Sequence, residues 1–362
     1  MAKLGEVCLL KAGKFVSAND ISPEYNKGLY PCFGGNGIRG YVADYTHDGE
    51  FPLIGRQGAL CGNVNLASGK FHATEHAVVV QPKIEMNVHW LYYALNAMNL
   101  GQYATGAAQP GLAVSKLETL SIEIPNISEQ NKIAQTLYKV EQLVNFRKQQ
   151  LAKLDELVKA RFVEMFGVVH NSVLYPYVPV ESFTSVVSGG TPNRNVSEFW
   201  NNGSIRWVKT TELQNNVICN TDEKITQAGL DNSSAKIIPP STVLIAMYGQ
   251  GKTRGMTGYT SIECATNQAC ACILPCEQFN QNYLWRYMIL SYDKLRDMAK
   301  GGNQPNLNIG IIKNFPVLKP PIELQNDFAA FVERVDQQKQ TVQQSLEKLE
   351  LMKKALMQEY LG

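Results

Sequence analysis

Apolar side chains in residues 128–166 follow a regular seven-residue rhythm. This stretch contains no Gly or Pro, and its apolar or long side chains are spaced alternately by four and three residues. Such spacing is typical of the seam of a coiled coil, where one stripe of a long helix packs on a partner. A stretch near the C-terminus has the same pattern in the same register. The predicted seam residues are Ile133, Leu137, Val140, Val144, Leu151, Leu154, Phe328, Val332, Val335, Val342, Leu346 and Leu349.

Each stretch predicts a helix of about 40 residues, roughly 60 Å long at 1.5 Å per residue. Prolines precede both stretches and Gly167 and Gly362 follow them, as expected at helix boundaries. Such a helix is longer than a domain of about 120–150 residues is wide. We therefore expect the two seams to bury each other, and if the helices run antiparallel, the two domains lie at opposite ends of the pair. The alternative is two independent amphipathic helices, each packed on its own domain.

The two helices belong to a longer internal repeat. At an offset of 195 residues the chain matches itself without a gap from Gly106 and Gly301 onward. Upstream, residues 71–82 and 4–14 resemble residues 263–274 and 180–190 at smaller offsets, which indicates loop insertions inside a duplicated domain. Identical pairs include Gln109/Gln304, Pro125/Pro320, Ile127/Ile322, Gln130/Gln325 and Asn131/Asn326. The predicted division alternates globular domains (1–124 and 168–318) with helices (125–167 and 319–362).

Composition fits a globular protein of two domains. The 362 residues are 44% apolar and 18% charged, and no apolar run reaches the roughly 18 residues of a membrane span. We expect a cytoplasmic protein with reduced cysteines. The net charge is +2, and the four predicted segments carry −1, +2, +2 and −1 in chain order. Phosphate neutralisation by this chain alone would be modest.

A glycine motif at residues 34–41, "GGNGIRGY", contains the G-x-G-x-x-G of dinucleotide-binding folds. That fingerprint needs a buried strand before it and a helix after it. The preceding run is broken by Pro31, and the following residues are aromatic and turn-rich. We interpret the motif as a glycine-rich turn or loop. The Phe33-x-Gly35-x-Gly37 spacing also occurs in adenine methyltransferases, but their Asn/Asp-Pro-Pro-Tyr/Phe motif is absent, so we expect no methylation by this chain alone.

Two further motifs suggest sites that the neighbouring residues do not support. "YGQGKTRG" (248–255) ends like a phosphate loop, but Ala246 stands where that loop requires glycine. It remains a basic loop, either contacting phosphates or bases or forming a solvated turn. Cys264, Cys270, Cys272 and Cys276 lack the paired C-x2-C spacing of zinc sites. Core cysteine is the better interpretation, and we predict no metal site.

Glycine-rich polar loops connect the short apolar strands of both domains. Arg, Lys, Asn, Gln and Thr on such loops are the residue types that recognise base edges in DNA. Two similar domains on a rigid spacer suggest recognition of two separated half-sites. The DNA-binding candidates are Asn36, Arg39, Arg56, Gln57, Asn63, Gln109, Arg194, Arg206, Lys209, Thr210, Gln250, Lys252, Arg254 and Gln304. No catalytic residue is predicted.

Over essentially its whole length the chain resembles the specificity (S) subunit of type I restriction-modification systems. The resemblance rests on "SGGTPNRNVSEFWNNGSIRWVKTTEL", "GGNGIRGYV", "FPLIGRQGALCGNVN", the two Gln-Pro-x-Leu stretches and the two heptad helices. It implies an α+β fold with two target recognition domains, held apart by an antiparallel pair of helices with pseudo-two-fold symmetry. Each domain would read one half of a bipartite DNA sequence, and the helices would set the spacing.

The resemblance also implies partners. The helices would dock methyltransferase (M) subunits, expected to be two per S chain, which use S-adenosylmethionine for adenine-N6 methylation of double-stranded DNA. An R subunit, where present, would use ATP and Mg for cleavage, while the S chain itself needs no cofactor. Two rival hypotheses are a stand-alone enzyme that binds a nucleotide in the glycine loops and a coiled-coil adaptor that binds no DNA.

Overall fold

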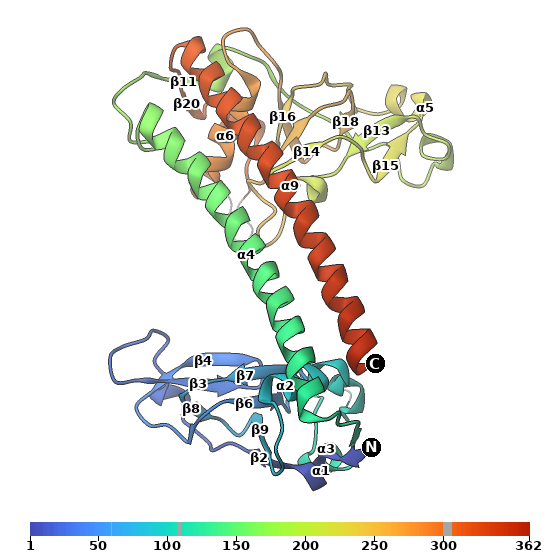
Figure 1. Cartoon of the computed structure of the whole chain (residues 1–362). Coiled ribbons are helices and arrows are strands. Elements are labelled where there is room, and N and C mark those ends of the chain that lie inside the picture. The colour runs from blue at the N-terminus through green and yellow to red at the C-terminus, as the bar shows by residue number, and fades with distance from the viewer. Residues whose placement is uncertain (59, 107–109, 300–305) are drawn as a thin grey trace. The chain divides into compact units, whose positions relative to one another are not determined.

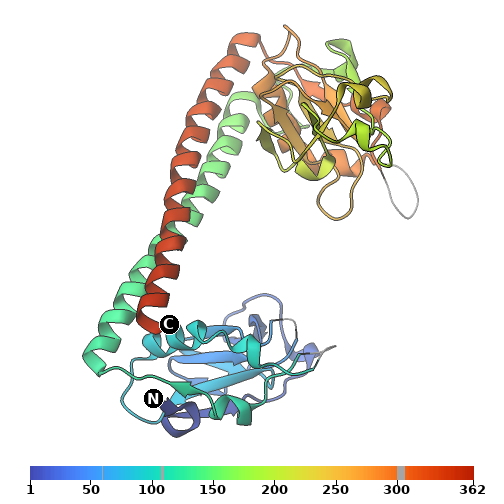
Figure 2. The same cartoon turned by 90° about the vertical axis from the view of Figure 1, so that its right-hand side faces the viewer.

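The computed structural model describes residues 1–58, 60–106, 110–299 and 306–362 of the chain. It divides into two compact units, Met1–Gln150 with Val342–Gly362, and Leu151–Thr341. Each unit contains one globular domain and one end of each long helix (Figures 1 and 2). The units therefore cut across the helices, whereas the sequence division was drawn at the helix ends. Over the described residues, no helix is long and apolar enough to cross a membrane.

The first unit is built on two sheets and a short strand pair. Helix α2 (Val88–Ala97) packs on β6 (Phe51–Gly55) and β7 (Val64–Ala67), and its Trp90 and Tyr93 are buried in the core. The other short helices are α1 (Leu4–Val7) and α3 (Val114–Glu118). One sheet has the order β2 (Cys8–Ala12), β9 (Ala77–Pro82), β6 (Phe51–Gly55), β7 (Val64–Ala67), and α2 spans Val88–Ala97. The other has the order β4 (Gly37–Val42), β3 (Tyr30–Gly34), β8 (Lys70–Ala73), β5 (His47–Asp48), and β1 (Ala2–Lys3) pairs with β10 (Ser121–Ile122).

The second unit repeats this plan, but its two sheets have five and three strands where those of the first unit have four each. That sheet has the order β12 (Val186–Ser188), β19 (Cys270–Ile273), β16 (Val243–Ala246), β17 (Thr257–Thr260), β14 (Asn216–Ile218). The smaller sheet has the order β15 (Glu223–Ile225), β13 (Ile205–Val208), β18 (Ala265–Thr266), and β11 (Tyr177–Pro179) pairs with β20 (Pro316–Leu318). The helices are α5 (Gln227–Asp231), α6 (Gln281–Leu290), α7 (Tyr292–Asp297) and α8 (Ile309–Lys313).

The two units share strand directions as well as strand order. Strands β3 and β13 are equivalent inner strands, and each pairs in parallel with a later strand, β8 or β18. The strand order β2-β9-β6-β7 of the first unit recurs as β12-β19-β16-β17 in the second, again with antiparallel neighbours. Helix α6 packs on β16 and β17 as α2 does on β6 and β7. These observations confirm the predicted α+β class and the internal duplication.

The long helices are α4 (Ile127–Phe166) and α9 (Ile322–Leu361), and they lie side by side within each unit (Figures 1 and 2). In the first unit Lys353 Nζ donates to Glu141 Oε1 (2.6 Å) and Lys148 pairs with Glu350 (2.9 Å). In the second, Lys339 Nζ donates to a carboxylate oxygen of Asp155 (2.6 Å). Because the helices contact each other in both units, the alternative of two helices packed independently on their own domains is wrong.

Some seam residues are buried against the other long helix, and others are also buried in the core of a domain. Most predicted seam residues are less than 10% exposed, and Leu151 and Leu349 are half-buried. Ile133 and Leu137 belong to the core of the first unit, and Phe328 and Val332 to that of the second. The first turns of each helix therefore anchor its own domain as well as facing the other helix.

The repeated Gln-Asn pair fastens each long helix to its domain. Gln130 is 2% exposed; its Oε1 accepts from the backbone N–H of Asn87 (2.9 Å) and its Nε2 donates to Pro125 O (2.8 Å). Asn87 in turn caps α2 and donates to Asn131 Oδ1 (2.6 Å). The second unit repeats every bond through Asn280, Pro320, Gln325 and Asn326. The repeated Gln-Asn pair thus has a structural role, because it satisfies buried polar groups where the long helix meets its domain.

Candidate nucleic-acid interface

In the first unit, candidates from separate segments gather around the turn between β3 and β4. Asn36 lies in this turn, and its Oδ1 accepts a hydrogen bond from Asn63 Nδ2 (2.9 Å), which comes from the loop before β7. Arg39 lies on β4, and its side chain covers Gly34 so closely that a Cβ there would lie 2.6 Å from Arg39 Cδ. Asn36, Arg39 and Asn63 are exposed. The fold therefore brings together polar side chains separated by 27 residues in the sequence.

Arg56 and Gln57 follow β6 and continue this group. Arg56 donates its N–H to His76 O (3.0 Å) and accepts at its carbonyl from Leu112 N (2.9 Å). Gln57 forms an antiparallel bridge with Gly111. The Arg56 side chain is half-buried, and its Nε has no hydrogen-bond partner among the described residues. Gln57 is exposed, so this backbone framework presents an amide group to solvent.

The second unit repeats the same backbone framework with different side chains. Met247 takes the place of Arg56, so Tyr248 takes the place of Gln57. The equivalent bonds are Met247 N to Ala269 O (2.8 Å), Leu307 N to Met247 O (3.0 Å), and Gly255 N to Ala246 O (2.9 Å), which corresponds to Gly62 N to Gly55 O (2.7 Å).

Tyr248 is a candidate that our sequence reasoning missed. It is 42% exposed at the end of β16 and offers a hydroxyl and an aromatic face where the first unit offers the amide of Gln57. The signal was present in the sequence, because Tyr248 directly follows the apolar run "VLIAM".

Side chains of α7 hydrogen-bond to the backbone of the loop that carries Gln250, Lys252 and Arg254. Arg296 Nη1 donates to the carbonyls of Gly251 (2.9 Å) and Arg254 (3.0 Å). Tyr292 Oη donates to Lys252 O (2.8 Å). Gln250 and Lys252 are exposed and Arg254 is half-buried. Their backbone is thus fixed, which reduces the conformational entropy lost when the loop binds a ligand.

Arg194 and Lys209 have internal partners. Arg194 Nη1 donates to Glu223 Oε2 (2.6 Å) and its guanidinium lies 3.8 Å from the ring centroid of Trp200. Lys209 Nζ donates to Glu223 Oε1 (3.1 Å). Burial alone would raise the pKa of the Glu223 carboxyl, but these two hydrogen bonds hold the pKa below its ordinary value. Glu223 therefore offsets part of the positive charge that these two cations could present to a phosphate.

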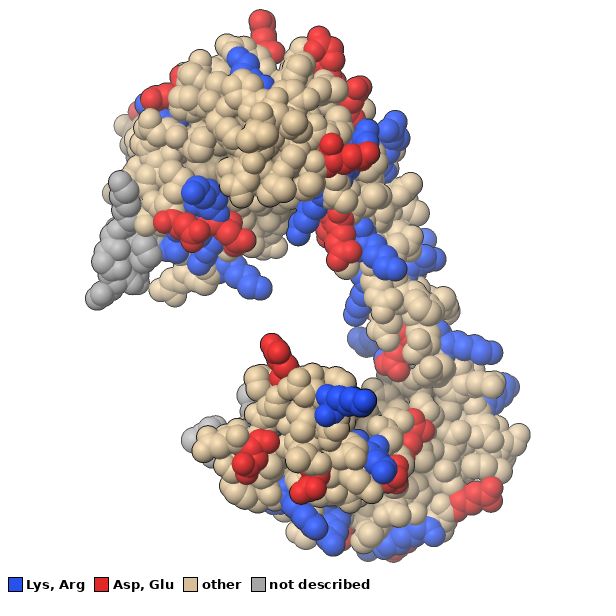
Figure 3. Space-filling model, turned by 90° about the vertical axis from the view of Figure 1, so that its left-hand side faces the viewer, with Lys and Arg blue, Asp and Glu red and all other residues tan. Residues whose placement is uncertain are grey.

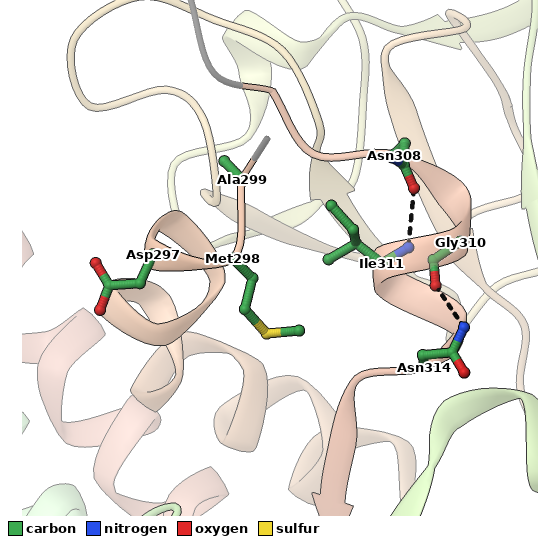
Figure 4. Close-up of a pocket in the computed structure, with 7 residues that line it drawn as sticks. All are labelled: Asp297, Met298, Ala299, Asn308, Gly310, Ile311 and Asn314. Carbon is green, nitrogen blue, oxygen red and sulfur yellow. Dashed lines mark hydrogen bonds between the residues drawn. The ribbon is translucent and has the colours of Figure 1, made fainter. Parts of the chain in front are cut away.

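The remaining candidates are dispersed or lie outside the described residues. Arg206 is exposed on β13, and Thr210 is half-buried just after it. Gln109 and Gln304 fall outside the described residues. The segments flanking Gln304 line an open hollow of about 480 Å³ (Figure 4). Asn308 Oδ1 caps α8 by accepting from Ile311 N (2.9 Å), and Asn314 Nδ2 donates to Gly310 O (2.9 Å) at the other end.

The structure explains the three motifs that we did not interpret as nucleotide or metal sites. Of the G-x-G-x-x-G glycines, Gly35 lies in the turn between β3 and β4, and Gly37 and Gly40 lie on β4, so a strand rather than a helix follows. The loop after β16 is followed by β17. Cys264, Cys270 and Cys272 are buried in the core, and burial raises the pKa of Cys264 and Cys272 to about 12. Among the described residues, no group of three or more His, Cys, Asp or Glu could hold a metal ion.

Charges of both signs are mixed on the visible surface. Lys and Arg lie beside Asp and Glu on both globular domains, and neither domain shows a broad field of one sign in this view (Figure 3). This pattern agrees with the near-neutral net charge of +2. A ligand would therefore be recognised by individual polar groups on the loops more than by a general positive potential.

Comparison with solved structures supports the fold over the whole chain. The S subunit of a type I restriction-modification system from M. genitalium superposes with a TM-score of 0.67 at 16% identity, covering 99% of this chain and 95% of that one. A chain from a study of complex assembly in the type I R-M system gives a TM-score of 0.59 at 14% identity, covering 99% and 96%. At these identities the likeness concerns the fold.

Sequence relatives match shorter segments. The EcoprrI specificity subunit of Escherichia coli is 53% identical over 143 residues, 39% of this chain and 36% of the relative. A putative type I restriction enzyme specificity subunit of Haemophilus influenzae is 37% identical over 113 residues, 30% of this chain and 29% of the relative. The match thus spans about a third of the length of these relatives. The sequence profile described as "Type I restriction modification DNA specificity domain" matches residues 1–156 and 177–351. This chain therefore belongs to the type I restriction-modification DNA specificity family.

Proposed function

We propose that this chain is the DNA-reading specificity subunit of a type I restriction-modification complex and has no catalytic activity of its own. The observation that carries the proposal is the repeated loop framework with exchanged side chains. The backbone bonds around Arg56 recur around Met247, yet Gln57 is replaced by Tyr248. The backbone bonds of the loop are the same in both domains, whereas the polar side chains that it presents differ. This is what two domains that read two different half-sites require, because base edges are distinguished by their hydrogen-bonding pattern.

The long helices would carry the protein partners. Several apolar side chains on α4 face solvent, including Tyr138, Leu143 and Phe146 at 45%, 46% and 58% exposure. Exposed apolar side chains on a helix are typical of surfaces that bind other proteins. In this proposal they contact methyltransferase subunits, two per chain, which supply S-adenosylmethionine chemistry at adenine N6. An R subunit would add ATP- and Mg-dependent cleavage of the double-stranded DNA.

The helices would also fix the number of base pairs between the half-sites. Both are uninterrupted over 40 residues and have a heptad seam, which makes them suited to act as a rigid spacer. Spacing set by a helix is a testable property, because each heptad adds about 10 Å.

Profiling of adenine methylation tests the proposal. The complex of this chain with its methyltransferase partner is expressed with Gln57→Ala or Tyr248→Ala, and methylated positions are mapped by long-read sequencing. We expect each variant to relax one half-site and leave the other intact, by about 5- to 150-fold for a contact of 1–3 kcal/mol. Gln149→Ala, at an exposed position of α4, is the control and should leave the motif unchanged. Relaxation of the same half-site by both variants would contradict the two-reader proposal.

A further inference from the structure

Arg194 of the second unit lies in a loop that two tryptophan side chains hold in place. Trp207 Nε1 donates to Gly190 O (2.9 Å) and Trp200 Nε1 donates to Asn193 O (3.1 Å). Trp207 is 1% exposed, and its ring packs edge-on against that of Trp200, with centroids 5.2 Å apart. The backbone that leads to Arg194 is therefore fixed from the core of this unit.

The guanidinium of Arg194 is also held in one orientation. It lies 3.8 Å from the ring centroid of Trp200, and its Nη1 donates to Glu223 Oε2 (2.6 Å). Glu223 is fixed in turn, because its Oε1 accepts from Lys209 Nζ (3.1 Å). The Arg194 side chain is 48% exposed, and its Nε and Nη2 have no hydrogen-bond partner among the described residues. The guanidinium is thus held on one side and offers free donors to solvent on the other.

Arg194 and Tyr248 lie at the same edge of the second unit. Residues 267–269, in the turn between β18 and β19, connect the two places. This turn is bonded to the end of β16 through Met247 N (2.8 Å), next to Tyr248, and to the loop of Arg194 through the Thr191 hydroxyl. A duplex that Tyr248 contacts can therefore also reach Arg194.

The carboxylate beside Arg194 disfavours a phosphate contact and favours a base contact. Attraction to phosphate depends on positive charge, and Glu223 offsets part of the charge of Arg194 and Lys209. A bidentate contact to a base edge depends instead on the direction of two N–H groups. Fixing the guanidinium beforehand also reduces the conformational entropy that is lost on binding.

We propose that Arg194 recognises a guanine in the half-site read by the second unit, an inference that rests on the proposed function. Guanine is the base that presents two adjacent acceptors, O6 and N7, in the major groove, and a guanidinium can donate to both. Trp200 and Glu223 are positioning residues, which orient the guanidinium without touching the base.

Methylation rates on a panel of duplexes test this inference. The complex of this chain with its methyltransferase partner is assayed on duplexes in which each base pair of the methylated motif is changed singly. We expect Arg194→Met, which keeps an unbranched side chain beside Trp200, to reduce the preference for one G·C pair by about 5- to 150-fold. That pair should lie in the half-site that Tyr248→Ala relaxes. Lys236→Met, at an exposed position of the same unit, is the control for the lost charge and should leave every preference unchanged.

Two further measurements separate base recognition from a structural role. Replacing the guanine by 7-deazaguanine removes only the N7 acceptor, and it should slow methylation by the wild-type complex but not slow Arg194→Met further. Because this change is made in the DNA, it tests the inference even where a variant is unstable. Glu223→Gln should lower the preference for the same pair by a smaller factor and raise the affinity for DNA of unrelated sequence, since it removes a negative charge. Loss of a structural contact would weaken binding to all sequences instead.

Several outcomes would overturn the inference. A uniform loss of rate with Arg194→Met on all duplexes would identify a phosphate contact. Unchanged preferences, relaxation at an A·T pair or in the other half-site, and a wild-type complex that is insensitive to 7-deazaguanine would each exclude guanine recognition by Arg194. None of these results contradicts the proposed function, whereas a wild-type complex that methylates no bipartite motif would refute the proposed function and the inference with it.

Discussion

Replacing Gln130 by Leu should loosen the first unit and leave the second unchanged. The substitution keeps the volume of a 2% exposed side chain but removes the bonds to Asn87 N (2.9 Å) and Pro125 O (2.8 Å). Each abandoned backbone group costs about 1–3 kcal/mol when it stays away from water. Since both groups lie near the helix start, where water can enter, we expect Gln130→Leu to lower the free energy of opening of the first unit by about 2–4 kcal/mol.

Hydrogen exchange followed by mass spectrometry measures this loss locally. Opening of the first unit should become about 30- to 700-fold more frequent, so amides of α2 and β9 exchange faster while those of α6 and β19 keep their rates. Gln325→Leu should produce the reverse pattern, because the second unit has the same bonds. The exposed Gln149→Leu is the control, with an effect within about 0.5 kcal/mol. Equal changes in both units for either variant would refute the view that each Gln fastens only its own domain.

Three further outcomes follow from the structure. Acidification below about pH 4 should lower the stability of the second unit by less than about 1 kcal/mol, because the pKa of Glu223 is lowered in the folded state and its partly exposed ion pairs are weak. Glu223→Gln should remove this contribution in thermal melts. A thiol reagent should modify the exposed Cys219 first and spare the buried thiols near β19 in the native chain, as mass mapping can check. Matched seven-residue insertions after Leu151 and Leu346 should lengthen the unread gap of the methylated motif by about three base pairs, and an unchanged gap would exclude the helices as the spacer.

The long helices and several core strands could be predicted because their signals are local. A seam spaced by four and three residues leaves little choice of structure, and apolar runs such as residues 243–246 and 270–273 form the expected strands β16 and β19. The core burial of Ile133 and Phe328 could not be predicted from the seam alone. A heptad pattern identifies a buried stripe but does not say whether a helix or a domain covers it.

The candidate interface was harder to predict because it depends on distant partners. Arg194 and Lys209 were selected as loop cations, yet both pair with Glu223, which is 29 and 14 residues away in the sequence. Gln57 and Tyr248 are equivalent at an offset of 191 residues rather than 195, since the loops differ in length. Only the backbone bonds of the folded chain establish that correspondence.

The two units have the same Gln and Asn hydrogen bonds between long helix and domain, but they differ in the ion pairs between the two long helices. In the first unit, Glu141 of α4 accepts from Tyr93 of α2 (2.9 Å) and from Lys353 of α9 (2.6 Å). In the second unit, Asp336 stands at the repeat position of Glu141 and pairs with Arg286 of α6. The acid at this position thus takes its cation from the other long helix in one unit and from its own domain in the other.

This difference specifies which helices pair. The apolar seams of α4 and α9 are alike, so hydrophobic burial alone would permit α4 to pair with α4 of another copy. In that arrangement the repeat position of Lys353 is Val158, and Glu141, whose side chain is only 24% exposed, would lose its cation. A partly buried carboxylate without a counter-charge is costly, whereas pairing α4 with α9 satisfies it. The seam therefore supplies the stability of the helix pair, and the polar residues beside it favour pairing of α4 with α9 over pairing of α4 with a second α4.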